Sequence, residues 1–188
     1  PGAYRVVRHD WRTPDSQIVS GGLHEELARL VNAAKRPVLI VGGGAWWELD
    51  RDTLASAVAA TGIPVFTTEL ARGLIPDDGK SCFGYAHPAF SRTFREIRSA
   101  DLLIFAGTEV NLHTGAPRKS LIAKDTKIVQ LHRDPLQIGI GRSTDLAIIG
   151  PLARSLRAMA QNIDHSAAAA HRSWLDHIRK SYAGHRTE

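Results

Sequence analysis

The segment Pro37-Val38-Leu39-Ile40-Val41-Gly42-Gly43-Gly44 carries the clearest information about the fold. Its four consecutive apolar residues, Val38 to Val41, show no alternation with polar residues. A strand of this kind is typical of a parallel sheet, in which helices cover both faces. The glycines that follow directly predict a tight turn at the carboxyl end of that strand.

Similar apolar segments recur along the chain. We expect further strands at residues 64–67, 82–84, 102–106, 128–131 and 146–149, and helices at 23–34, 50–61, 90–98 and 151–163. Strands that alternate with helices predict a parallel sheet with right-handed crossovers. The expected fold class is therefore α/β, a three-layer Rossmann-like sandwich with a parallel sheet of five or six strands.

The helix expected at residues 50–61 has recognisable ends. Asp50 suits the N-cap position, and Gly62 suits the position directly after the last turn. The apolar stripe that should face the core consists of Leu54, Ala55, Val58 and Ala59.

The two ends of the chain differ from its middle. Residues 1–21 show no clear period and are expected to form a linker or an arm, followed by one domain at 22–164. Residues 165–188 are expected to form a linker helix towards a missing C-terminal domain, with Ala167–Ala170 as a spacer. Because the chain lacks an initiator methionine, we expect a processed chain or an excised piece.

Composition excludes several classes of protein. The 188 residues carry a net charge of +5, but Lys and Arg are interleaved with acidic residues, so we expect no nucleic-acid partner. No apolar run is long enough to cross a bilayer, so no membrane association is expected. The single cysteine, Cys82, precludes an internal disulfide and favours a reducing, cytoplasmic location.

Four loops should meet at the carboxyl ends of the strands, where ligands bind in such sheets. They span residues 42–47, 68–76, 107–115 and 132–141. Gly42 and Gly44 match the first two glycines of a dinucleotide fingerprint, but Trp47 occupies the place of the third. Two interpretations therefore stay open, a tight turn that only needs glycine or a nucleotide-binding crevice.

The sequence offers little catalytic chemistry. Histidine and cysteine spacings match no metal motif, and no G-x-S-x-G elbow or P-loop is present, so we predict no catalytic residues and no metal site. His113 and His132 lie on loops at strand ends, where a surface role is the simpler interpretation. Glu69 and Glu109 follow two strands, and acid–base chemistry would require them to share one crevice.

Taken in order, six motifs resemble the central domain of thiamine-diphosphate-dependent enzymes of the acetolactate synthase and benzoylformate decarboxylase kind. The resemblance covers residues 22–178. It is carried by Ala34–Gly44, by Pro64–Thr68 with Arg72–Asp78 and Gly84, by Ala100–Gly107, by Lys127–Leu131 with Asp134-Pro135 and Ile138-Gly139, by Asp145–Gly150, and by Arg172–Leu175, which resembles the linker to the third domain.

The resemblance implies a six-stranded parallel sheet in the middle of a larger lyase or transferase that acts on 2-oxo acids or acyl-CoA-like substrates. Flanking pyrimidine- and diphosphate-binding domains would hold thiamine diphosphate and magnesium, and the parent would be a homo-oligomer. The central domain would organise subunits and catalyse nothing alone.

Some members of that family bind FAD or ADP in this domain. The positions that match such contacts are Gly42, Gly43, Gly44, Thr68, Gly84, Gly107 and Asn111. Three departures disfavour a bound nucleotide: His132 and Pro151 stand where the family has aspartates, and Glu109 where it has arginine. The expectation is a vestigial site. An ADP- or FAD-binding module is the alternative, and an independent NAD-dependent enzyme a third possibility.

Overall fold

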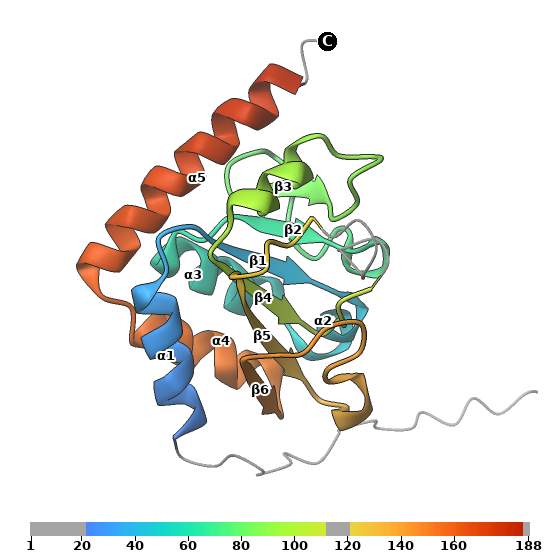
Figure 1. Ribbon diagram of the computed structural model, residues 1–188, viewed down its shortest axis with the longest axis vertical. Helices are drawn as coiled ribbons and strands as arrows, with labels where there is room; N and C mark the ends of the chain where they lie inside the picture. The colour runs from blue at the N-terminus through green and yellow to red at the C-terminus, as the bar shows by residue number, and fades with distance from the viewer. Residues whose placement is uncertain (1–21, 112–120, 186–188) are drawn as a thin grey trace, which may run out of the picture.

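A single parallel sheet forms the centre of the computed structural model, which describes residues 22–111 and 121–185 (Figure 1). The six strands follow the order β3-β2-β1-β4-β5-β6, and every pair is parallel. Their bounds are Pro37–Val41 for β1, Val65–Thr67 for β2, Cys82–Tyr85 for β3, Leu102–Ala106 for β4, Lys127–His132 for β5 and Leu146–Ile149 for β6. This architecture confirms the predicted three-layer α/β sandwich.

Helices cover both faces of the sheet. The α-helices are α1 (Leu23–Ala33), α2 (Gly43–Glu48), α3 (Arg51–Thr61), α4 (Leu152–Gln161) and α5 (His165–His185), and the 3₁₀ segments are η1 (Glu69–Ala71), η2 (Thr93–Ser99) and η3 (Pro135–Gln137). Within the described ranges, no helix is both long and apolar enough to cross a bilayer.

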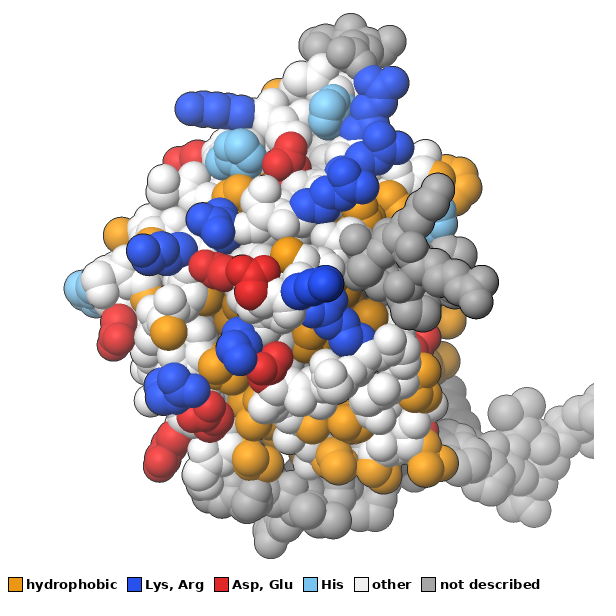
Figure 2. Space-filling view, viewed as in Figure 1, with side chains coloured by type: hydrophobic (Ala, Val, Ile, Leu, Met, Phe, Trp, Pro, Cys, Tyr) orange, Lys and Arg blue, Asp and Glu red, His pale blue; other side chains and the backbone are white. Residues whose placement is uncertain are grey.

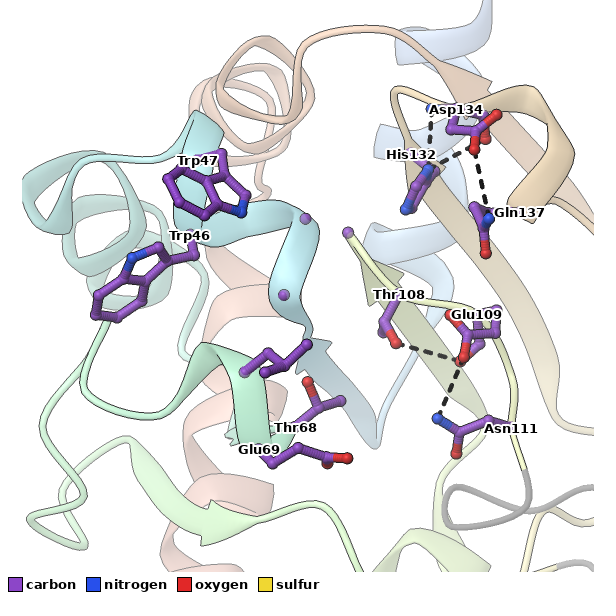
Figure 3. A pocket seen from close by; sticks show the side chains of 14 residues that line it. Trp46, Trp47, Thr68, Glu69, Thr108, Glu109, Asn111, His132, Asp134 and Gln137 are labelled. Carbon is purple, nitrogen blue, oxygen red and sulfur yellow. Dashed lines mark hydrogen bonds between the residues drawn. The ribbon is translucent and has the colours of Figure 1, made fainter. Parts of the chain in front are cut away.

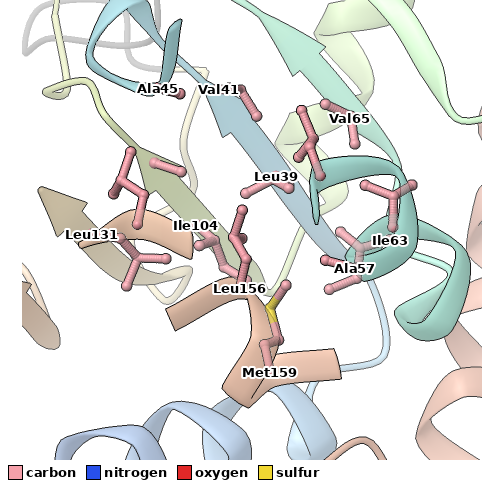
Figure 4. Packing of buried hydrophobic residues seen from close by; sticks show 14 of the residues in the cluster. Leu39, Val41, Ala45, Ala57, Ile63, Val65, Ile104, Leu131, Leu156 and Met159 are labelled. Atoms are coloured by element: carbon pink, nitrogen blue, oxygen red, sulfur yellow. The ribbon is translucent and has the colours of Figure 1, made fainter. Parts of the chain in front are cut away.

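Each central strand contributes side chains to two separate hydrophobic cores, because successive side chains point to opposite faces of the sheet. Leu39 and Val41 pack with α1, α3 and α4 on one face, where Leu156 of α4 lies fully buried (Figure 4). Val38 and Ile40 pack on the other face, against residues of η2 and α5. Two-sided burial explains why these strands read as unbroken apolar runs.

The ends of α3 form as the sequence predicts. The Asp50 carboxylate accepts a hydrogen bond from the Thr53 N–H at 2.6 Å, and Gly62 adopts the left-handed conformation with φ of 68°. The buried stripe differs from the prediction, because Ala55 and Ala59 are exposed. The stripe instead consists of Leu54, Ala57, Val58 and Thr61, which keeps the helical spacing.

Three segments correct the sequence interpretation. The loop expected at 42–47 is mostly helical, since α2 begins at Gly43. The helix expected from Phe90 begins at Thr93 as a 3₁₀ segment, which leaves Phe90 77% exposed in the preceding turn. The spacer expected at Ala167–Ala170 belongs to α5, where Ala167 and Ala168 are buried because a small side chain lets the helix approach the domain closely.

Charged side chains on the viewed surface are mixed in sign. Figure 2 shows basic and acidic side chains side by side over much of this face. Local ion pairs also occur within helices, such as Arg29 with Glu26 at 2.6 Å in α1 and Arg179 with Asp176 at 2.7 Å in α5. Both signs occur together mainly on the left of this view, whereas several basic side chains neighbour one another at its upper right (Figure 2).

Candidate functional site

A crevice of about 650 Å³ lies at the carboxyl ends of the strands, at the point where the sheet order reverses between β1 and β4. This switch point is the usual ligand-binding place in open parallel sheets. Segments that follow β1, β2, β4 and β5 line the crevice (Figure 3). The lining residues are Gly43, Gly44, Trp46, Trp47, Thr68, Glu69, Leu70, Gly107, Thr108, Glu109, Asn111, His132, Asp134 and Gln137.

Most of the predicted contact positions meet in this crevice. Those that line it are Gly43, Gly44, Thr68, Gly107 and Asn111. Gly42 is not among the residues that line it and instead contacts Gly107 and Thr108, and Gly84 of β3 lines a separate hollow of about 500 Å³. His132 lines the crevice, whereas His113 falls outside the described residues.

The glycine segment at the start of α2 packs directly onto the end of β4. A side-chain carbon at Gly42 would lie 2.2 Å from Thr108 Cβ, and one at Gly107 would lie 2.5 Å from the Ala45 nitrogen. Contacts this short leave no room for any side chain, so these positions require glycine for backbone packing alone. Backbone packing therefore explains the glycines at positions 42 and 107 without any ligand.

Backbone hydrogen bonds also join the start of α2 to the end of β4. The Gly42 N–H donates to Ala106 O, and the Gly44 N–H donates to Gly107 O, each at 2.9 Å. The Gly107 N–H in turn donates to Leu131 O at 2.9 Å. Phosphate binding at a glycine turn relies on free N–H groups directed at the ligand. Here the N–H groups of Gly42 and Gly44 already serve the contact between β1, β4 and β5.

Polar side chains around the crevice are held by their neighbours. The Tyr85 hydroxyl donates to Glu69 Oε2 at 2.8 Å, and Asn111 donates to Glu109 Oε1 at 3.4 Å. Partial burial and the bond to Glu69 raise the pKa of Tyr85. The Asp134 carboxylate accepts from the Leu136 N–H at 2.9 Å and so fixes the start of η3.

Buried Gln130 positions the loop that follows β5. Its side-chain amide donates to Gln137 O at 3.2 Å and accepts from the Gly139 N–H at 2.7 Å. Gln137 thereby reaches the crevice, although its sequence pattern did not single it out. Thr108 and Leu70 were missed in the same way. All three lie in segments that were predicted to be loops at the carboxyl ends of strands. This position was the only sequence signal that could have pointed to them.

The crevice has an acidic character. Glu69, Glu109 and Asp134 line it, and no Lys or Arg is found among the lining residues that belong to the described ranges 22–111 and 121–185. Arg133, next to the lining His132, instead pairs with Glu48 of α2 at 3.3 Å, and Glu48 also accepts from the Leu152 N–H at 3.2 Å. Carboxylates repel the phosphates of a nucleotide, so this electrostatic environment disfavours a dinucleotide.

The indole rings of Trp46 and Trp47 lie on the α2 side of the crevice, across from His132 and Asn111 (Figure 3). Trp47 is 87% exposed and Trp46 is 43% exposed. Neither ring is therefore packed into the domain as a core residue would be.

Nor do the residues present fit thiamine diphosphate with its metal. The part of the chain that the structure describes holds no group of three or more His, Cys, Asp or Glu residues arranged to bind a metal ion. Glu69 and Glu109 do line one crevice, but each is bonded to a neighbouring side chain rather than to the other. No chemical step is therefore assigned to these groups.

Comparison with known families decides what this domain is. Residues 24–159 match the family model of the thiamine pyrophosphate enzyme central domain. The chain belongs to this family. The match spans the six described strands, the helices α2 and α3 and most of α4, so the predicted resemblance is confirmed.

Curated relatives of this central domain are longer enzymes. An acetolactate synthase of Mycobacterium avium is 30% identical over 166 residues, which cover 84% of this chain and 26% of the relative. A 2-hydroxyacyl-CoA lyase 2 of Caenorhabditis elegans is 31% identical over 163 residues, which cover 83% of this chain and 24% of the relative. The chain thus spans about a quarter of the length of these curated relatives.

A solved structure shares the fold of this central domain. It comes from Mycobacterium smegmatis and is assigned as a thiamin diphosphate-dependent enzyme. Its TM-score is 0.63 at 22% identity, and the match covers 75% of this chain and 27% of that one. At this identity the likeness supports the fold alone.

Proposed function

We propose that this chain is the non-catalytic central domain of a larger thiamine-diphosphate-dependent lyase or transferase. The substrates would be 2-oxo acids or acyl-CoA-like compounds, which is supported by the acetolactate synthases and 2-hydroxyacyl-CoA lyases among its relatives. Flanking pyrimidine- and diphosphate-binding domains would carry thiamine diphosphate and magnesium. The central domain would organise these domains and the subunits of a homo-oligomer. We place the enzyme in the cytoplasm, in keeping with the single, buried cysteine of this chain.

The crevice at the switch point is, in this proposal, a vestigial nucleotide site. The observation that carries the proposal is the hydrogen bond from the Gly44 N–H to Gly107 O, which occupies a donor that a diphosphate would need. Carboxylates at Glu69, Glu109 and Asp134 add electrostatic repulsion to that loss. Gly43, Gly44, Thr68, Gly107 and Asn111 would then be inherited contact positions without a ligand.

An ADP- or FAD-binding module remains the second candidate. The observation in its favour is that five of the seven predicted contact positions line one crevice of about 650 Å³. Pockets of this volume accommodate a cofactor-sized ligand. The two candidates differ in one measurable property, which is the affinity of the crevice for ADP.

Calorimetric titration separates these candidates. We expect wild-type protein to show no saturable binding of ADP or FAD at concentrations up to about 1 mM, which corresponds to a binding free energy weaker than about −4 kcal/mol. The variant Glu109→Arg should bring ADP binding into the measurable millimolar range, because a guanidinium can pair with a diphosphate.

The matched control is Glu25→Arg, the same charge reversal at an exposed position of α1. It should leave ADP binding undetectable, since Glu25 does not line the crevice. Micromolar binding of ADP or FAD by the wild type would establish the occupied module instead. Equal ADP binding by the two variants would show that the charge at position 109 does not control the affinity of the crevice for ADP.

A further inference from the structure

Large apolar side chains that remain exposed gather at one edge of the sheet. The described ranges 22–111 and 121–185 contain seven of them. Six lie in the segment that follows a strand or form the last residue of a strand: Trp46, Trp47, Leu70, Phe90, Leu136 and Ile149. The seventh, Ile140, lies in the connection between β5 and β6. The strand arrowheads in Figure 1 mark this carboxyl edge of the sheet.

The opposite edge of the sheet is charged instead. The turns that precede β1 to β5 span residues 34–36, 62–64, 78–81, 99–101 and 123–126. They carry Lys35, Arg36, Lys80, Asp101 and Lys124, and none of the seven exposed apolar residues lies in them. Single exposed apolar side chains are ordinary, but a group of them on one side of a domain marks an interaction surface.

Four of these side chains surround the crevice, and we call them the crevice rim: Trp46, Trp47, Leu70 and Leu136. The first three line the crevice, and Leu136 lies between the lining residues Asp134 and Gln137. A carbon added at Gly43 would lie 2.8 Å from Leu70 Cβ, so the start of α2 packs directly against η1. Leu70 nevertheless remains 75% exposed and Leu136 79% exposed.

The crevice between these side chains is acidic. The carboxylates of Glu69, Glu109 and Asp134 line it, and each keeps acceptor positions beyond its present hydrogen bonds. A surface that covers the rim must therefore be apolar, and it must also offer a positive charge to the crevice. Arginine among apolar side chains is typical of the centre of a protein interface.

The relatives indicate what could supply such a surface. The regions that match this chain cover 26% of the acetolactate synthase and 24% of the 2-hydroxyacyl-CoA lyase. About three quarters of each of these enzymes therefore lies outside the matching region. A domain in the middle of such an enzyme needs at least one face that contacts the remainder of the chain.

We propose that the crevice rim is the surface on which another domain of the longer enzyme docks, with a Lys or Arg side chain of that domain in the acidic crevice. This inference rests on the proposed function, which supplies the longer enzyme. It adds the face of the central domain that makes the contact and the chemistry of the surface that covers it.

The first test compares maleimide labelling of Trp47→Cys in this chain alone and in the longer enzyme, read by mass spectrometry of the peptide that contains position 47. Burial raises the pKa of the native Cys82 thiol, which keeps it protonated and unreactive. We expect labelling at position 47 to be at least about tenfold slower in the longer enzyme, because an interface core excludes water and reagent. The control Lys124→Cys, at an exposed position of the opposite edge, should label at similar rates in both proteins.

The second test examines the charge of the docking partner. Adding Glu109→Arg to Trp47→Cys in the longer enzyme places a positive charge where the partner's cation should lie, so labelling should become several-fold faster. Adding Glu25→Arg, on exposed α1, should leave the rate unchanged. Protection that survives Glu109→Arg would contradict a basic side chain in the crevice.

The remaining outcomes separate this inference from the proposed function. Equal labelling of position 47 in both proteins, or equal protection of position 124 in the longer enzyme, would overturn docking on the rim. Labelling of this chain alone that slows as its concentration rises would make a second copy the occupant and would also overturn it. Turnover of the longer enzyme with and without thiamine diphosphate tests the proposed function independently, so either proposal can fail while the other stands.

Discussion

Replacing Gly107 with alanine is expected to lower the free energy of unfolding by about 2–5 kcal/mol. The added carbon would lie 2.5 Å from the Ala45 nitrogen and 2.9 Å from the Gly44 carbonyl carbon, both in the backbone. Backbone atoms at a helix start cannot move aside as a flexible side chain can. Gly107 also adopts φ of 69°, which costs an L-residue about 1–2 kcal/mol.

The control for this change is Gly139→Ala. Gly139 has a similar φ of 77°, but nothing lies within 4 Å of the added carbon. It should therefore cost only the conformational term of about 1–2 kcal/mol. Urea unfolding of both variants measures the difference. If the two losses are equal, the close contact between α2 and β4 does not exist as described.

Replacing Phe66 with alanine is the second change with a large expected effect, a loss of about 3–5 kcal/mol. Phe66 of β2 is fully buried in the core that lies under α5 and η2. Its ring centroid lies 5.1 Å from that of Phe94 in an edge-to-face arrangement and 6.0 Å from that of Phe83. Removing the ring opens a cavity and breaks both aromatic contacts.

Phe90→Ala provides the same chemical change at the surface. Phe90 is 77% exposed and makes ring contacts with Tyr85 and His87. Its loss should cost about 1 kcal/mol, the value of an aromatic contact rather than of a buried ring. Comparable losses for the two phenylalanines in chemical denaturation would show that Phe66 is not the centre of this core.

The parallel sheet could be predicted because its signal is local. The central strands β1 and β4 are unbroken apolar runs that are buried on both faces, and such runs predict strands of a parallel sheet. The ends of α3 were predictable for the same reason, since Asp50 bonds to Thr53 only three residues away. Even the short strand β3 (Cys82–Tyr85) was predicted to within one residue, at 82–84.

The role of the glycines could not be read from the sequence. Gly42 and Gly44 face Gly107 and Thr108, which lie more than sixty residues further along the chain. A glycine that admits a phosphate and a glycine that admits a neighbouring strand have the same local signature. Only the three-dimensional contacts distinguish the two roles.

His171 illustrates the same limit in another part of the fold. In the sequence it belongs to residues 165–188, which were expected to form a linker helix. Its hydrogen-bond partners, the carbonyl oxygens of Thr61 at the end of α3 and of Ala34 after α1, lie 110 and 137 residues away. Continuation of α5 through the four alanines, rather than a spacer, brings the ring to both helix ends. Long-range contacts therefore decide where this side chain lies.

The charge of the crevice could be predicted from the sequence only in part. Glu109 could be identified from the sequence as an unfavourable charge for a diphosphate, and it does line the crevice. The fold of the loop after β5 decides the other charges. It brings the Asp134 carboxylate into the crevice, and it pairs Arg133 with Glu48 of α2. The combined acidity strengthens the proposal that the site is vestigial.

The most direct measurement is amide hydrogen exchange at Gly42 and Gly44, followed by NMR with and without about 1 mM ADP or FAD. If both N–H groups serve the junction with β4, they should exchange as slowly as amides of the central strands, and neither ligand should change their rates. Rapid exchange in the free protein that slows when ADP or FAD is added would contradict this account, because the donors would then be available to a nucleotide.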